Sequence, residues 1–123
     1  TLSTNSLSWV VSQSDPTGQC NQPIDGTTAP VIMQVRSGAE RTGNVVIAVT
    51  GGSTATFNGL GRLQSAGITQ IDFSNTSGTC QYVDPANGTM RCLRILVSSG
   101  GQARLCDPQV ATPVPPVIDP RAC

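Results

Sequence analysis

The five cysteines are the residues of this chain whose chemistry is most readily assigned. Five in 123 residues favour an oxidising compartment, periplasmic or extracellular, where thiols form disulfides. Cys80 and Cys92 flank a polar excursion and are predicted to close it as a small loop. Cys106 and Cys123 flank a proline-rich tail. No other feature of the sequence would attach this tail to the domain, so these two cysteines are predicted to pair as well. Disulfide formation is therefore the expected chemistry of four cysteines.

Cys20 is left over in this pairing, and the simplest interpretation is a partner upstream of Thr1. A cytosolic chain with free thiols or a metal site is the alternative. It is less favoured because the sequence has no CxxC spacing and no histidine, which are typical of zinc sites. No metal site is expected.

Catalytic and cofactor-binding patterns are missing from the sequence. Without histidine there is no usual general base, and the carboxylates are scattered singly among turns. No nucleophile lies in an elbow motif, and the glycines match neither a dinucleotide-binding pattern nor a phosphate-binding loop. The chain is therefore predicted not to be an enzyme, and no cofactor is expected.

The composition favours a small β domain, and the balanced charges give it no net electrostatic attraction for a charged partner. Seven arginines balance seven acidic residues, so any attraction to nucleic acid or membrane must be local. Only four residues are aromatic, and a core of Val, Ile, Leu and Ala suits sheets. No apolar run reaches the roughly 18 residues that a membrane-spanning helix needs, so the sequence shown is expected to be soluble.

The stretch 93–106 is predicted to form a β-hairpin, because apolar residues alternate at 93, 95 and 97 before a Ser-Ser-Gly-Gly turn. A three-residue loop at 99–101, with a left-handed glycine, places Arg94 opposite Cys106 and Leu96 opposite Arg104. Leu105 then joins the apolar side. A two-residue loop would turn Arg104 onto that side, which is disfavoured where one face is core. The two arginines should therefore share the outer face.

Short strands separated by turn residues are predicted along the rest of the chain. Since both faces of the strand at 44–50 are apolar, it is expected to be central in its sheet. No stretch of ten residues has a helical period. The expected fold is an all-β, two-sheet antiparallel β-sandwich over residues 1–106, with a proline-rich tail, 107–123, packed on it and tied by a disulfide. Besides the hairpin, the predicted strands are 7–12, 30–36, 44–50, 55–59 and 68–74.

Three segments carry a resemblance to a known family. ATFNGLGRLQSAG, TSGTC and MRCLRILVSSGGQARLCDP resemble the C-terminal half of the GspH/FimT family, the minor pilins and pseudopilins of type IV pili and type II secretion systems. The resemblance covers roughly residues 54–108, and WVVSQSDPTGQC is compatible with an earlier strand. It implies an upstream apolar helix that anchors the subunit in the inner membrane, and a first strand before Thr1 that offers Cys20 a partner.

Some FimT-type members bind DNA through a GRxR motif before the last hairpin cysteine and through a basic tail. The matching residues here are Gly101, Gln102, Ala103 and Arg104, so one of the two arginines is replaced. The tail has one arginine and two aspartates, and phosphate binding scales with the number of cationic contacts. The candidate DNA contacts are Arg62, Arg94, Arg104 and Arg121.

The resemblance predicts a minor pilin that contributes to pilus assembly and priming at the tip. Its expected partners are other minor and major pilins, with weak DNA binding as a further possibility. It would occupy the inner membrane and periplasm before assembly, and the cell surface afterwards. The alternatives are a DNA-binding minor pilin for natural transformation and a type II secretion pseudopilin.

Overall fold

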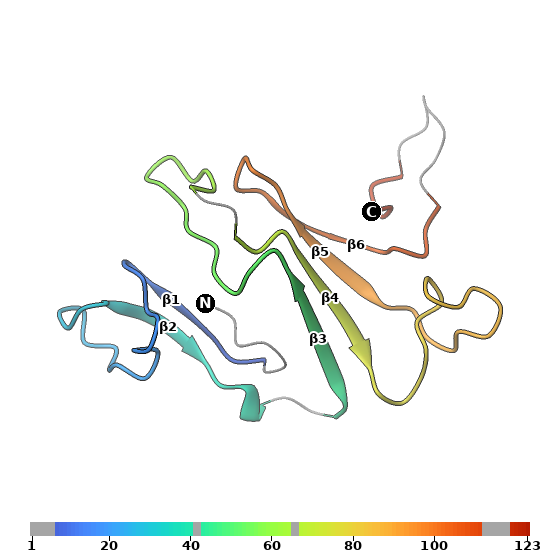
Figure 1. Cartoon of the computed structure of the whole chain (residues 1–123), viewed down its shortest axis with the longest axis horizontal. Coiled ribbons are helices and arrows are strands. Elements are labelled where there is room, and N and C mark those ends of the chain that lie inside the picture. Colours follow the sequence, from blue (N-terminus) through green and yellow to red (C-terminus); the bar gives the residue numbers. More distant parts are fainter. Residues whose placement is uncertain (1–6, 41–42, 65–66, 112–118) are drawn as a thin grey trace.

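The computed structural model describes residues 7–40, 43–64, 67–111 and 119–123, and these form two antiparallel sheets (Figure 1). The smaller sheet pairs β1 (Trp9–Ser12) with β2 (Ile32–Arg36). The larger sheet has the order β3-β4-β5-β6. Its strands are β3 (Val45–Thr50), β4 (Gln70–Asn75), β5 (Leu93–Val97) and β6 (Ala103–Cys106).

The all-β, two-sheet part of the prediction is confirmed. The only helical element of the described residues is a 3-10 turn, Gly38–Glu40. None of their helices is long and apolar enough to cross a membrane. In Figure 1 the β1–β2 sheet lies beside the β3 side of the larger sheet. The face-to-face packing of a sandwich and the division at residue 106 stay predictions.

The β5–β6 hairpin has the predicted register. Arg94 lies opposite Cys106, and Leu96 lies opposite Arg104. The loop is closed by bonds from the Ser98 N–H to the Gln102 carbonyl and from the Gly101 N–H to the Ser98 carbonyl, both 2.9 Å. Gly101 has φ 84°, the left-handed conformation that a three-residue hairpin loop requires. The turn sequence therefore sets the register of this strand pair.

The larger sheet has one apolar face, which is covered only in part. The register places the odd-numbered residues of all four strands on this side. Ile47 on β3 is buried, with 5% of its surface exposed, whereas Leu93 on β5 is 44% exposed and Leu105 on β6 is 57% exposed. We call this side the apolar sheet face. The expectation that Leu105 joins an apolar side is confirmed, but the described residues do not bury it.

Two strand predictions are wrong. β3 is an edge strand in the described sheet, although apolar residues on both of its faces predicted a central position. The alternation of side chains along a strand indicates whether each of its two faces is buried. It does not indicate whether another strand is hydrogen-bonded along each of its two edges. Residues 55–59 form no strand and make only an isolated bridge between Phe57 and Leu63, because a tight turn follows Phe57.

The two predicted disulfides are present, Cys80–Cys92 with Cα atoms 5.5 Å apart and Cys106–Cys123 with Cα atoms 5.2 Å apart. Cys20 is a free, half-buried thiol. Half-cystines make up three of the seven buried apolar residues of the described chain, so the cross-links are part of its core. The seven are Ile32, Ile47, Ile68, Cys80, Cys92, Cys106 and Ala122.

Candidate nucleic-acid interface

The loop around Arg62 has a conformation fixed by hydrogen bonds. The Asn58 side-chain oxygen accepts bonds from the N–H groups of Leu60, at 2.9 Å, and Arg62, at 3.0 Å. The Asn58 N–H also donates to the Arg62 carbonyl at 2.9 Å. Such local bonds explain why asparagine and glycine recur in tight turns. The loop thus presents Arg62 and Leu60, which is 86% exposed, from a rigid base.

This loop packs directly against the turn of the β5–β6 hairpin. A Cβ atom added to Gly101 would lie 1.8 Å from the Gly61 carbonyl oxygen and 3.4 Å from the Arg62 Cα. Only glycine permits this approach, and Gly101 also has a positive φ. The structure therefore brings together two segments that the sequence singled out separately, and places Arg62 beside the hairpin.

Arg94 is engaged inside the sheet. Its Nε donates to an Asp72 carboxylate oxygen at 2.7 Å, and the two side chains are 22% and 15% exposed. The guanidinium also lies over the Tyr82 ring, 5.4 Å from its centre, which is within cation–π range. A phosphate would have to displace Asp72 to reach this charge. Arg94 therefore shares a face with Arg104, as predicted, but is not a free cation.

The tail arginine is paired as well. Arg121 donates from Nε at 3.0 Å and from an NH2 group at 2.7 Å to the Asp119 carboxylate. These bonds lower the pKa of Asp119 to about 2 and raise the pKa of Arg121. Both groups are therefore fully charged at neutral pH and largely cancel each other.

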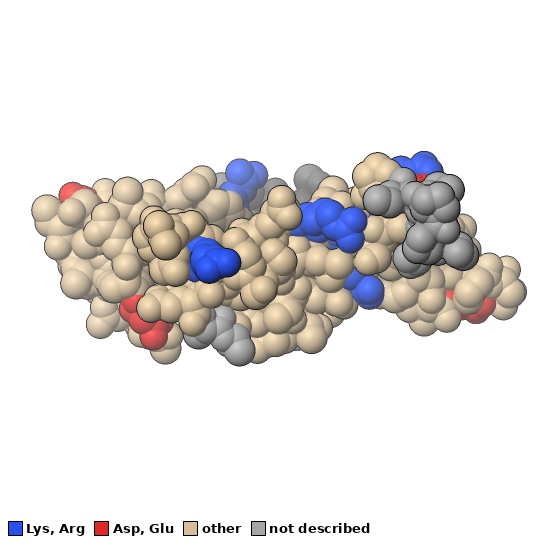
Figure 2. Space-filling view, turned by 90° about the horizontal axis from the view of Figure 1, so that it is seen from above, with Lys and Arg blue, Asp and Glu red and all other residues tan. Residues whose placement is uncertain are grey.

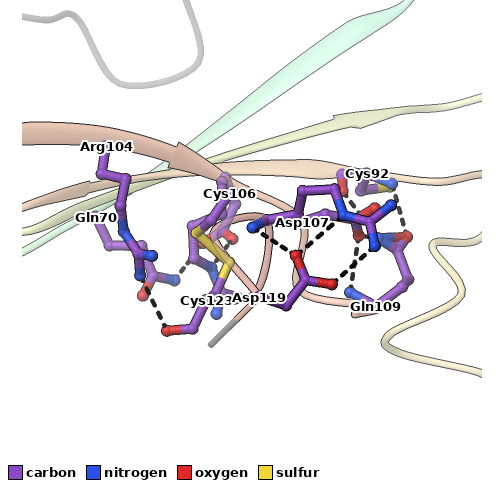
Figure 3. Close-up of a disulfide and its surroundings, with 11 residues drawn as sticks. Gln70, Cys92, Arg104, Cys106, Asp107, Gln109, Asp119 and Cys123 are labelled. Carbon is purple, nitrogen blue, oxygen red and sulfur yellow. Dashed lines mark hydrogen bonds and ion pairs between the residues drawn. A yellow bond between two sulfur atoms is a disulfide. The ribbon is translucent and has the colours of Figure 1, made fainter. Parts of the chain in front are cut away.

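A third ion pair joins the tail to the end of the disulfide loop. Arg91 donates to the Asp107 carboxylate, and Gln109 donates to it from its backbone N–H at 2.9 Å. Burial pushes the pKa of Asp107 up, but the bonds from Gln109 and Arg91 prevail and hold it below its usual value. Gln109 also bonds both backbone groups of Cys92, as Figure 3 shows beside the disulfide. This network fixes the start of the tail against the two residues that precede β5.

Two of the four candidate arginines, Arg62 and Arg104, make no ion pair with an aspartate or glutamate side chain in the described residues. Both are exposed. Arg104 makes one long contact, 3.5 Å, to the Cys123 carbonyl oxygen (Figure 3). On the face seen in Figure 2 the arginines form separate groups and not one basic surface. The candidate site is therefore limited to two available cations near the hairpin.

Sequence reasoning missed the partners of Arg94 and Arg91. Asp72 lies 22 positions before Arg94, and only the β4–β5 register places the two side chains opposite each other. The alternation in each strand was visible in the sequence, but the offset between the strands was not. Among the described residues no cluster of three or more potential metal ligands occurs.

Comparisons with family models, with curated proteins and with solved structures find no match for this chain.

Proposed function

We propose that this chain is the β domain of a minor pilin of the GspH/FimT type, acting in type IV pilus assembly and priming at the tip. The observation that carries the proposal is the apolar sheet face, exposed at Leu93 and Leu105. An uncovered apolar patch on a small domain is characteristic of a surface that another element covers. In the proposed subunit an apolar helix upstream of Thr1 packs there, and the two sheets take up the β-sandwich of the family.

The disulfides fit the route of such a subunit. Cross-links of this kind form in oxidising compartments, and the proposed subunit folds in the periplasm while its helix is held in the inner membrane. Assembly then carries it to the cell surface, among other minor and major pilins. A pseudopilin of a type II secretion system would use the same surface, and its neighbours would be pseudopilins.

A DNA receptor of the same family is the other candidate. It is supported by two exposed arginines, Arg62 at the loop–hairpin contact and Arg104 on β6 of the same hairpin. Ion pairing of Arg94 and Arg121 weighs against it, since each paired guanidinium must leave a carboxylate before it neutralises a phosphate. A structural minor pilin is therefore the better supported function.

The test places a charge on the apolar sheet face in the full-length natural protein. Leu105→Asp should abolish incorporation into sheared pili, because a helix packed on this face would bury the carboxylate. Val83→Asp is the matched control, since Val83 is 64% exposed on the Cys80–Cys92 loop. Incorporation of both variants at the level of the parent protein would refute the proposed role of this face.

A further inference from the structure

Two asparagine residues of this chain are followed by glycine, Asn58 before Gly59 and Asn87 before Gly88. Both asparagine side chains are exposed. Asparagine before glycine is the sequence that loses ammonia most readily, because the backbone nitrogen of a residue without a side chain closes easily onto the asparagine amide. The two pairs differ in what their reacting groups bind, so the fold itself decides which of them can react.

The reacting nitrogens of the first pair are unprotected. Within the described residues, the Gly59 N–H donates no hydrogen bond, and the amide nitrogen of the Asn58 side chain has no partner. A Cβ atom added to Gly59 would meet no other atom within 4 Å, so the backbone has room to turn there. The nitrogen that attacks and the nitrogen that leaves are therefore both available.

The carbonyl group of the Asn58 side chain is held by two donors. Its oxygen accepts hydrogen bonds from the N–H groups of Leu60, at 2.9 Å, and Arg62, at 3.0 Å. Negative charge develops on this oxygen when a nitrogen adds to the side-chain carbon. Backbone N–H groups at about 2.7–3.1 Å stabilise such a charge, as in an oxyanion hole. The turn that fixes the loop therefore also favours the addition step.

The second pair is closed by its contacts with Asp84. The Gly88 N–H donates to the Asp84 carbonyl at 2.7 Å, and the amide nitrogen of the Asn87 side chain donates to the Asp84 carboxylate at 3.3 Å. A Cβ atom added to Gly88 would lie 2.6 Å from the Gln81 Cα, so the backbone is also tightly packed. Attack and departure at Asn87 both require this turn to open.

We propose that Asn58 is a site of spontaneous deamidation to aspartate and isoaspartate, and that Asn87 is protected from it. The Gly59 nitrogen gives its proton to solvent and bonds to the Asn58 side-chain carbon. The bond from this carbon to the amide nitrogen breaks, and the nitrogen takes up a proton and leaves as ammonia. Water then opens the cyclic imide at either carbonyl. Asparagine and water thus give an acid and ammonia, without oxidant, cofactor or enzyme.

The modification alters the loop that contacts the β5–β6 hairpin. Each product carries a new carboxylate in the loop of Arg62, and isoaspartate also lengthens the main chain by one carbon. The Gly61 carbonyl oxygen lies so close to Gly101 that an added Cβ atom would approach it to 1.8 Å, so this contact tolerates little displacement. Deamidation is therefore expected to weaken the contact and to add negative charge near an available cation. The site does not depend on the pilin assignment.

The test is incubation of the whole chain in mildly alkaline buffer, followed by peptide mapping with mass spectrometry and separation of aspartate from isoaspartate. Asn58 should react about tenfold or more faster than Asn87, because Asn87 must first lose a backbone hydrogen bond and a bond to a carboxylate. Asp84→Ala should speed the reaction at Asn87 and leave Asn58 unchanged. Equal rates at the two asparagines of the parent protein would overturn the proposal.

Two comparisons separate activation by the turn from simple exposure. A free peptide of residues 55–63 gives the rate without the fold, and Asn58 in the folded chain should react at least as fast; a slower rate would show protection and refute the proposal. Leu60→Pro removes one donor to the Asn58 oxygen and should slow the reaction about tenfold or more. Leu60→Ala keeps this N–H, and the side chain it shortens is 86% exposed, so its rate should be unchanged. Equal slowing in both variants would contradict the role of the N–H group.

Discussion

Weak DNA binding with a shallow salt dependence is the sharpest expectation for this protein. The perturbation is removal of a free cation by Arg104→Ala. The log-log slope of affinity against salt is about −0.9 per neutralised phosphate on duplex DNA. Two available arginines, Arg62 and Arg104, therefore give a slope of about −1.8, or about a tenfold loss of affinity between 50 and 200 mM salt. Arg104→Ala should reduce the slope to about −0.9.

The assay is fluorescence anisotropy with a labelled duplex across a salt series. At physiological salt no complex is expected below about 10⁻⁵ M protein, since proteins with many more phosphate contacts bind non-specifically at about 10⁻⁴ to 10⁻⁶ M. Gln102→Arg restores the second arginine of the GRxR pattern at an exposed position. It should steepen the slope to about −2.7.

Variants of the tail ion pair supply the control. Arg121→Ala should leave the slope near −1.8, because Asp119 already balances this arginine in the parent protein. Asp119→Asn should free Arg121 and steepen the slope to about −2.7. Micromolar binding that Arg104→Ala abolishes, or a parent slope of about −4 or steeper, would refute the two-cation reasoning and favour the DNA receptor.

Three further predictions concern stability and pH. Gly101→Ala should lower the free energy of unfolding in urea by about 1–3 kcal/mol, because its Cβ would strike the neighbouring loop and φ is positive, whereas Gly100→Ala should have little effect; similar losses would contradict the close contact. Asp72→Asn should cost about 1–2 kcal/mol by leaving Arg94 half-buried without a counter-ion, and an unchanged melting temperature would contradict it. Because the pKa of Asp119 is depressed, its ion pair stabilises the folded state fully at pH values above the ordinary pKa of 3.8, and this stability is lost as the pH falls through about 2. An NMR titration of the Asp119 carboxyl should give a midpoint near 2, and a midpoint near 4 would rule the ion pair out.

Much of the candidate site could be predicted from local sequence. The hairpin register followed from the turn residues and the alternation of Leu93 and Ile95, because both are encoded within a few positions. The pairing of the four cysteines followed from the loops they bracket. The availability of the arginines could not be predicted. It depends on which carboxylate the register places opposite Arg94, and that offset is decided by the whole sheet.

The sequence by itself determined that this is a disulfide-linked all-β domain, because composition and period-2 alternation act locally. The sequence also lacks the residue patterns that are typical of catalytic sites. Only the tertiary structure decided that β3 is the first strand of the sheet formed by the described residues, that the Gly61 and Gly101 backbones touch, and that Leu93 and Leu105 on the apolar sheet face are exposed. Strand order and the closing of loops on each other depend on contacts between residues far apart in the chain. Alternation specifies the two faces of a strand, whereas its neighbours are chosen by the packing of all the strands together.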